Sequence, residues 1–244
     1  MTVVSMCVQV SAPPRLQPPQ LINRHVRKQG SLGHYPAADH PPGSVREIWD
    51  WDGSFYIGSI PEVPHTYNVV GNTNEFGLTI GETTWGGTSN GKQEGAIMDY
   101  GSLIWVTLQR SKTAREAITT IDNLTNTYGY SSSGESFSIG DPKEVWLMEI
   151  YPKGSLELGA VWVASKVPDG YIGAHANQCR TRKFAMDDPE NVRYAKDVVE
   201  FAQKTGQYPK DGKPEDFDFA AAYDPLSFSG ARFCEARVWN IFQK

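Results

Sequence analysis

Cysteine is scarce in this sequence, with Cys7, Cys179 and Cys234 among 244 residues. Three widely separated cysteines cannot form the disulfide framework of a small secreted domain, and they lack the spacing of a zinc site. Free thiols fit a reducing compartment, which favours the cytoplasm without settling the location. The sequence also lacks an HExxH pattern and a phosphate-binding glycine loop, so it predicts neither a bound metal nor a cofactor.

Long apolar runs are missing as well, since no stretch approaches the roughly 18 apolar residues of a membrane helix. The net charge of −5 gives no reason to expect a nucleic acid or an anionic membrane as a partner. A hydrophobic fraction of 39%, with 11% aromatic residues, is enough for a substantial core. The length favours one large domain over two small ones.

Acidic residues are absent before Asp39, although this first segment carries arginines at 15, 24 and 27. Prolines at 13, 14, 18 and 19 would interrupt a helix or strand there. We therefore expect a divergent or disordered leader over residues 1–34 and a globular domain over residues 35–244. A targeting peptide is an alternative because the leader is poor in acids, but its prolines and few serines weaken that interpretation. It contains no secretory apolar core followed by a small-residue cleavage site.

Two hairpins are predicted first in the globular part. Asp52-Gly53 reads as a turn between apolar and aromatic segments. Residues 66–70 are rich in β-formers, residues 71–74 supply a turn, and residues 78–80 return as a strand. The pattern places Glu82, Thr83 and Thr84 at the end of that strand.

Further elements follow from periodicity and capping. Helices are predicted at 102–109, at 113–128 with the capping-box spacing of Thr113 and Glu116, and at about 229–242. Asp188, followed by a proline, predicts the N-cap of a helix whose apolar face runs over residues 192–202. Strands are predicted on both sides of the Asp141-Pro142 turn, at 160–167 and at 171–174. Antiparallel hairpins with helices between them indicate an α+β fold.

Several segments carry a resemblance that extends from about Tyr35 to the last residues. The quoted segments are Pro64-His-Thr-Tyr67, Asn74-Glu-Phe-Gly-Leu78, Gly81-Glu-Thr-Thr-Trp-Gly-Gly87, residues 134–149, Pro168-Asp-Gly-Tyr-Ile-Gly-Ala-His-Ala-Asn-Gln178 and Ala231-Arg-Phe-Cys-Glu-Ala-Arg-Val-Trp239. Together they resemble the cysteine dipeptidases of the N-terminal-nucleophile hydrolase superfamily, peptidase family C69. Several long matches in chain order are more specific than any single motif.

The resemblance implies a fold and a reaction. The expected fold is a four-layer αββα sandwich, incomplete at both ends of this sequence because chains of the family are longer. Missing strands would expose sheet edges and apolar faces, which predicts poor solubility or a homo-oligomer. The implied substrate is a short peptide with a free amino terminus. The implied nucleophile is a cysteine at the start of the mature chain, whose α-amino group, with a pKa of roughly 7.7–8.0, serves as the base.

The nucleophile is where this sequence departs from the family pattern. Cys7 would become the first residue if residues 1–6 were removed. The segment after it does not match the strand and turn of the family, and Pro13 and Pro14 would interrupt a central strand. The alternative is that the leader replaces the true start and leaves an inactive fragment or pseudoenzyme. An acyl-amide hydrolase of the same superfamily is a third possibility, although the motif at 81–87 favours a dipeptidase.

Four other residues are candidates for the site. By resemblance, the Asn177 side chain donates to the oxyanion, and Arg232 is the superfamily arginine that would stabilise a thiolate. The Thr84 hydroxyl is a candidate second oxyanion donor, and Glu82 a candidate partner of the substrate's ammonium group. We expect Cys179 and Cys234 to be structural thiols. His65 and His175, the histidines inside matched motifs, are interpreted as polar structural residues.

Overall fold

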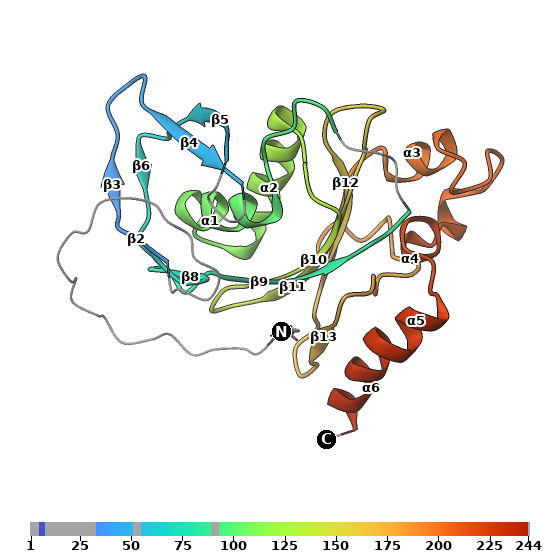
Figure 1. Ribbon diagram of the computed structural model, residues 1–244. Coiled ribbons are helices and arrows are strands. Elements are labelled where there is room, and N and C mark those ends of the chain that lie inside the picture. Colours follow the sequence, from blue (N-terminus) through green and yellow to red (C-terminus); the bar gives the residue numbers. More distant parts are fainter. Residues whose placement is uncertain (1–4, 8–32, 51–54, 89–92, 244) are drawn as a thin grey trace.

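The computed structural model describes residues 5–7, 33–50, 55–88 and 93–243. Its centre is an eight-stranded antiparallel sheet in the order β14-β12-β11-β10-β9-β8-β7-β2 (Figure 1). The bounds of these strands, in chain order, are His34–Tyr35 (β2), Val69–Val70 (β7), Thr73–Asn74 (β8), Thr79–Trp85 (β9), Gly134–Gly140 (β10), Val145–Pro152 (β11), Ala160–Lys166 (β12) and Val192–Tyr194 (β14).

Three two-stranded pairs accompany this sheet in the described part of the chain. The strand β1 pairs with β13, β3 with β6, and β4 with β5, all antiparallel. Their bounds are Ser5–Cys7 (β1), Ala38–Asp39 (β3), Val45–Trp49 (β4), Tyr56–Pro61 (β5), His65–Thr66 (β6) and Gly173–His175 (β13). The expected turn at Asp52-Gly53 lies outside the described residues, although β4 and β5 pair on either side of it.

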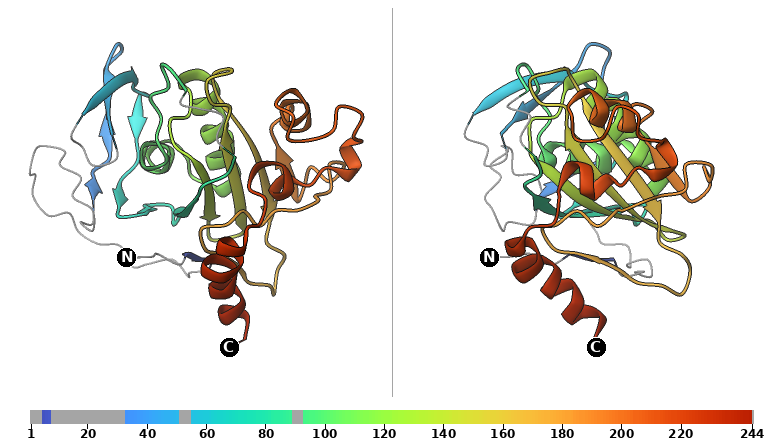
Figure 2. Two further views of the ribbon diagram at one scale, coloured as in Figure 1. Left: turned by 45° about the vertical axis from the view of Figure 1, so that its right-hand side comes forward. Right: turned by 90° about the vertical axis from the view of Figure 1, so that its right-hand side faces the viewer.

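Helices α1 and α2 lie on one face of the large sheet (Figures 1 and 2). The helix α1 spans Tyr100–Arg110, and Asp99 caps it by accepting from the Ser102 N–H at 2.5 Å. The helix α2 spans Ala114–Tyr128 and begins as predicted, because the Thr113 hydroxyl accepts from the Glu116 N–H. The inner sides of both helices are apolar, and they bury the main core against β9–β12.

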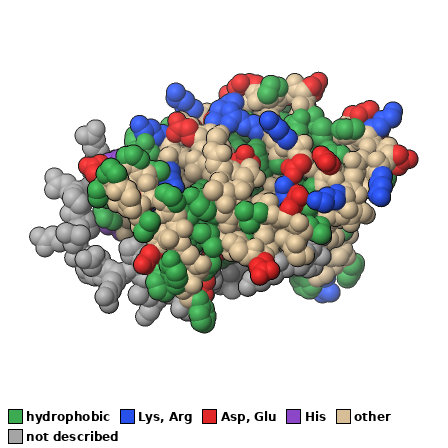
Figure 3. Space-filling view, turned by 90° about the horizontal axis from the view of Figure 1, so that it is seen from above, with side chains coloured by type: hydrophobic (Ala, Val, Ile, Leu, Met, Phe, Trp, Pro, Cys, Tyr) green, Lys and Arg blue, Asp and Glu red, His purple; other side chains and the backbone are tan. Residues whose placement is uncertain are grey.

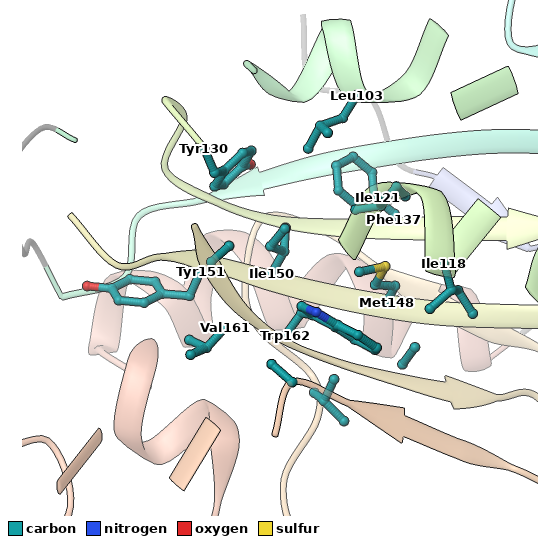
Figure 4. Close-up of a cluster of buried hydrophobic side chains, with 14 of the residues drawn as sticks. Leu103, Ile118, Ile121, Tyr130, Phe137, Met148, Ile150, Tyr151, Val161 and Trp162 are labelled. Atoms are coloured by element: carbon teal, nitrogen blue, oxygen red, sulfur yellow. The ribbon is translucent and has the colours of Figure 1, made fainter. Parts of the chain in front are cut away.

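A close-up of that core shows how the helices meet the sheet (Figure 4). Leu103 of α1 and Ile121 of α2 are buried with Phe137 of β10 and Met148 of β11. Trp162 of β12 is also anchored, because its indole N–H donates to the Asp122 carboxylate at 2.7 Å. Burial of such side chains, each contributing about 1.5–3 kcal/mol, fixes which face of each strand is turned toward the helices.

The opposite face of the sheet is covered by the later part of the chain and by the β1–β13 pair (Figure 2). The bounds of the later helices are Val198–Lys204 (α3), Pro214–Asp216 (η1, 3₁₀), Phe219–Tyr223 (α4), Phe228–Gly230 (α5), Ala231–Glu235 (η2, a π-helix) and Ala236–Phe242 (α6). The helix α6 packs beside β13, since Val238 forms a small buried cluster with Ala174 and Ala176. This mixture of a large antiparallel sheet and helices is the α+β architecture that the sequence predicts.

The predicted turn at 71–74 is too long, because Thr73–Asn74 form strand β8 and pair with β7 and β9. Two further local predictions are wrong. Residues 192–202 do not form one helix, since Val192–Tyr194 pair with β12 as β14 and α3 starts only at Val198. Asp188 instead closes a turn by accepting from the Asn191 N–H at 3.2 Å. The strand that was predicted to end near residue 80 continues to Trp85, so that Glu82, Thr83 and Thr84 lie within it. Tertiary pairing supplies the backbone partners that decide both cases.

The surface above α1 and α2 shows positive and negative side chains interspersed (Figure 3). In the described residues, no helix combines the length and apolarity needed to cross a membrane.

Candidate active site

Asn177 lies just beyond the end of β13 and has a left-handed backbone, with φ of 58°. It is the one non-glycine residue in the described chain with positive φ. Asparagine tolerates this conformation better than most residues because its short polar side chain can bond locally. The turn directs the side chain toward β9 and α6, where it makes both of its hydrogen bonds.

The orientation of the Asn177 amide follows from its two neighbours. Its Nδ2 donates to the Thr84 backbone carbonyl at 2.5 Å, and its Oδ1 accepts from Arg237 Nη2 at 3.0 Å. A guanidinium can only donate and a carbonyl can only accept, so the amide cannot be reversed. One hydrogen of the Asn177 amide is therefore held by Thr84, and the described residues provide no acceptor for the second.

Arg237 is the arginine that contacts Asn177. Its Nη2 also donates to the Ala176 carbonyl at 3.0 Å, and its Nε donates to the Phe233 carbonyl at 2.5 Å. Its Nη1 is buried and has no hydrogen-bond partner among the described residues. A fixed positive charge with a free donor is thus held beside the Asn177 amide.

Arg232, the arginine predicted for this role, is exposed, and its guanidinium lies 5.1 Å from the centre of the Phe233 ring. The structure therefore pairs Asn177 with the second arginine of the same motif. The sequence does not distinguish the two arginines, but the structure does, because Val238, which follows Arg237, is the buried residue of α6. Residue 237 begins the turn that packs on β13, whereas residue 232 lies more than one turn earlier.

The strand that carries Cys7 runs beside β13. In the pair of strands, Ser5 is opposite His175 and Cys7 is opposite Gly173. This short strand also lies near β9 and β10. The backbone of Cys7 is therefore close in space to the segment that leads to Asn177, while its side chain lies outside the described part.

His175 joins three strands through its ring. Its Nδ1 is 2.5 Å from the Thr83 hydroxyl of β9, and its Nε2 is 2.6 Å from the Ser138 hydroxyl of β10. The residue is completely buried. Burial lowers the pKa of His175 to about 4, with a smaller contribution from Arg180, so the ring is neutral at pH 7. A neutral ring donates through one nitrogen and accepts through the other, and two hydroxyls can satisfy both.

The contact between Ser138 and His175 looks like a serine–histidine dyad, but it lacks exposure to substrate and a carboxylate partner for the ring. Thr83, Ser138 and His175 are all buried, so the hydroxyls are not exposed to a substrate carbonyl in this structure. The outer partner of the ring is a threonine hydroxyl, which does not stabilise an imidazolium as a carboxylate does. The contacts of His175 are therefore structural ones at the base of the candidate site.

Thr84 and Glu82 turn their side chains toward the opposite face of the sheet. Successive side chains of a strand alternate between faces, and Thr83 contacts His175. The Thr84 hydroxyl donates to the buried Glu135 carboxyl at 2.8 Å, on the side of α1 and α2. Only the backbone carbonyl of Thr84 meets Asn177. The structure thus does not bring the Thr84 hydroxyl or the Glu82 carboxyl to the side on which Asn177 lies.

Glu82 and Glu135 form a hydrogen-bonded pair of carboxyl groups on that helical side. Burial, and then the charge of Glu82, raise the pKa of Glu135 to about 9. Burial also raises the pKa of Glu82, and a hydrogen bond with Glu135 opposes this shift. Both pKa shifts fit a neutral Glu135 beside an ionised Glu82, since ionising two close carboxyl groups together is unfavourable. This pair could not be predicted from the sequence, because Glu135 was not distinguishable from an exposed strand residue.

Cys179 is a buried thiol that donates to the Glu149 carboxylate at 3.1 Å. Burial, and then the charge of Glu149, raise the pKa of Cys179 well above its ordinary value. A nucleophilic cysteine requires the reverse, a lowered pKa and access to substrate. Glu149 also accepts from Ser136, and from the N–H groups of Arg180 and Thr181. Cys179 is therefore part of a buried hydrogen-bond network, as a structural thiol would be, and Cys234 is partly exposed in the last helical segment.

An open hollow of about 510 Å³ lies between α6 and the segment after β13. The ion pair between Arg180 and Glu235 lies at its wall. Trp239 and Phe242 line it and stay largely exposed. Among the described residues, no three His, Cys, Asp or Glu side chains gather as ligands for a metal ion.

Comparison with known protein families identifies the class to which this chain belongs. The sequence model described as peptidase family C69 matches residues 20–244. The chain therefore belongs to peptidase family C69.

One relative in that comparison is a probable dipeptidase of Latilactobacillus sakei. It is 25% identical over 138 residues, which cover 57% of this chain and 27% of the relative. The match thus spans about a quarter of the length of that relative.

Proposed function

We propose that this chain carries part of a dipeptidase site and hydrolyses short peptides that have a free amino terminus. The observation that carries the proposal is the Asn177 amide, held between the Thr84 carbonyl and Arg237 at the end of the strand that pairs with β1. Membership of peptidase family C69 and the similarity to a probable dipeptidase give the substrate class.

The proposed reaction uses Cys7 after cleavage of the Met6–Cys7 bond. The new α-amino group of Cys7 takes the thiol proton, and the sulfur attacks the peptide carbonyl. The free hydrogen of the Asn177 amide then stabilises the oxyanion, and Arg237 holds that amide in place. The leaving amine takes the proton from the α-amino group, and a water molecule hydrolyses the thioester to restore the thiol. In this scheme Arg237 takes the place given to Arg232, and the Thr84 hydroxyl and Glu82 have no step.

The layering supports the four-layer αββα sandwich as the fold of the family domain. Helices α1 and α2 lie outside the large sheet, β1–β13 lies across its other face, and α6 packs outside β13 (Figure 2). The second sheet contains two strands in the described residues. The complete four-layer sandwich is therefore our proposal for the family domain.

A second candidate is a catalytically inactive member of the family. It is favoured by Pro13 and Pro14, which follow Cys7 closely. An acyl-amide hydrolase remains the third candidate, and a substrate panel distinguishes it.

The test combines intact mass measurement with hydrolysis. The intact mass of the purified protein shows whether Cys7 is its first residue. The same protein is assayed for hydrolysis of a dipeptide panel and of acylated amines. The variants are Cys7→Ala and the matched control Cys234→Ala. We expect a chain that starts at Cys7, cleaves dipeptides and loses turnover only with Cys7→Ala. Turnover that survives Cys7→Ala refutes Cys7 as the nucleophile. A folded chain with no turnover establishes the inactive alternative, and preference for acylated amines establishes the third.

A further inference from the structure

Two neighbouring residues of β9 contact two alternate residues of the segment around β13. Thr83 contacts the His175 ring through its side chain, and Thr84 contacts the Asn177 amide through its backbone carbonyl, both at 2.5 Å. The His175 contact therefore sets how β13 lies on the sheet at the point where Asn177 must reach Thr84. A shift of this strand would move both contacts together.

The ring of His175 also fixes β13 against a second strand. Ser138 of β10 lies 2.6 Å from the other ring nitrogen, on the same face of the sheet as Thr83. The strand β13 has only three residues, and its strand partner in the described part of the chain is the equally short β1. So short a pair supplies few backbone hydrogen bonds of its own, and the two side-chain bonds of His175 add a link to the large sheet.

The surroundings of His175 keep the ring neutral. The residue is completely buried, and the positive charge of Arg180 disfavours protonation of the ring. A neutral imidazole has distinct donor and acceptor nitrogens, so the ring holds a single orientation between the two hydroxyls. This rigidity is what a group must have if it is to hold another residue in place.

We infer that His175 is a positioning residue, which holds the Asn177 amide in its productive place by tying β13 to β9 and β10. The inference rests on the proposed function of Asn177 as an oxyanion donor. It gives a task in the site to a histidine that makes no contact with the reacting atoms.

The two bonds of the ring can be removed one at a time. Asparagine places an amide near the former Nδ1 and can keep the Thr83 contact, and glutamine reaches the place of Nε2 and can keep the Ser138 contact. The variants are therefore His175→Asn and His175→Gln, with Thr83→Val as the deletion on the partner side. The control is His65→Asn, because His65 is an exposed residue bonded to Asp39 at 2.7 Å.

The kinetic test is a double-mutant cycle with Asn177→Asp. A displaced donor lowers kcat on the order of 10²-fold, and we expect this loss for His175→Gln and Thr83→Val with a smaller change in KM. His175→Asn should recover part of the loss, because it keeps the contact nearer to Asn177. In the Asn177→Asp background the His175 variants should cost little more. Fully additive losses would refute the inference, because they would show that His175 does not act through Asn177.

A second readout decides the inference even for a chain without turnover. The side-chain amide protons of Asn177 are followed by NMR and by hydrogen exchange in the folded protein. We expect them to shift and exchange faster in His175→Gln and Thr83→Val, and to stay unchanged in His65→Asn. Unchanged Asn177 signals in the His175 variants would overturn the inference, whereas absent turnover with shifted signals would overturn only the proposed function.

Discussion

The side-chain amide of Asn177 donates to the backbone carbonyl of Thr84, and the same side chain accepts from Arg237. The two contacts have different consequences for mutation. One consumes a hydrogen of the amide, and the other fixes which way the amide points.

We first predict the effect of Asn177→Asp. Aspartate keeps the size, the tolerance of a left-handed backbone and the contact with Arg237, but it cannot donate to Thr84 or to an oxyanion. We expect kcat to fall on the order of 10²–10³-fold in steady-state assays of the active form. The control is Asn240→Asp on the exposed side of α6, which should leave kcat unchanged. An unaffected Asn177→Asp enzyme would remove Asn177 from the mechanism.

The second prediction separates the two arginines of the last motif. Lysine keeps the charge of Arg237 but loses the fork that reaches the Ala176 carbonyl and the Asn177 amide together. We expect Arg237→Lys to lower kcat at least tenfold, since each lost charge-assisted bond contributes about 1.5–3 kcal/mol. Arg232→Lys should have no such effect because Arg232 is exposed. The reverse order of effects in the same assay would restore the role given to Arg232 by resemblance.

The third prediction concerns alkaline pH and Glu135. Its pKa of about 9 in the folded protein lies above the ordinary 4.5, so the native state keeps a proton that the unfolded chain releases. The free energy of unfolding therefore falls as pH rises from about 4.5 to about 9, by at most about 1.4 kcal/mol per pH unit for one proton. Glu135→Gln mimics the neutral carboxyl and should flatten this slope in denaturant titrations at pH 5, 7 and 9. Glu94→Gln is the control, since Glu94 is exposed. An unchanged slope would mean that Glu135 is ionised.

The fourth prediction concerns acidic pH and His175. The pKa of His175 is about 4 in the folded protein, below the ordinary 6.5. Between these pH values the unfolded chain binds a proton at this residue and the native state does not. Stability from this group is present above about pH 6.5 and is lost as pH falls toward 4. His175→Asn should therefore weaken the acid dependence of the unfolding free energy between these values, and His65→Asn should not. A wild-type slope in His175→Asn would show that His175 does not titrate as described.

The fifth prediction tests packing at the end of β10. A Cβ on Gly134 would lie 2.2 Å from the Trp85 ring, and that ring is fully buried and stacked with Tyr151. The ring cannot move without disturbing this stack, so we expect Gly134→Ala to cost about 1–3 kcal/mol in chemical denaturation. A Cβ on Gly86 meets nothing within 4 Å, so Gly86→Ala is the matched control. Equal stabilities of the two variants would contradict the packing described.

The sequence predicted those elements whose signals are local. Helix α2 follows from the spacing of its apolar residues and from the Thr113 cap, and the β10–β11 hairpin follows from the Asp141-Pro142 turn. The helix expected at 192–202 failed because Val192–Tyr194 find backbone partners in β12. Helical periodicity cannot reveal a strand partner that lies some 30 residues away in the chain.

The sequence predicted Asn177 as a candidate site residue, but it did not predict the neighbours of Asn177. The motif around Asn177 was found, and Asn177 does meet β9. Side chains alternate between the two faces of a sheet only within a strand. The faces of Glu82 and Thr84 could not be predicted, because the strand was expected to end near residue 80 and β9 continues to Trp85. The choice between Arg232 and Arg237 depends on which turn of the last helix packs on β13, and only the tertiary contacts of Val238 show that.

The alternation of β9 makes its length unusually intolerant of change. Thr83 and Thr84 are adjacent, yet the Thr83 side chain contacts the buried His175 and the Thr84 side chain contacts Glu135 on the side of α1 and α2. Inserting or deleting one residue upstream of them in this strand would exchange the two compartments and place the Glu82 carboxyl or the Thr84 side chain against His175. Homologous chains should therefore vary in the loops around β9 while keeping the residue count from Leu78 to Trp85 constant.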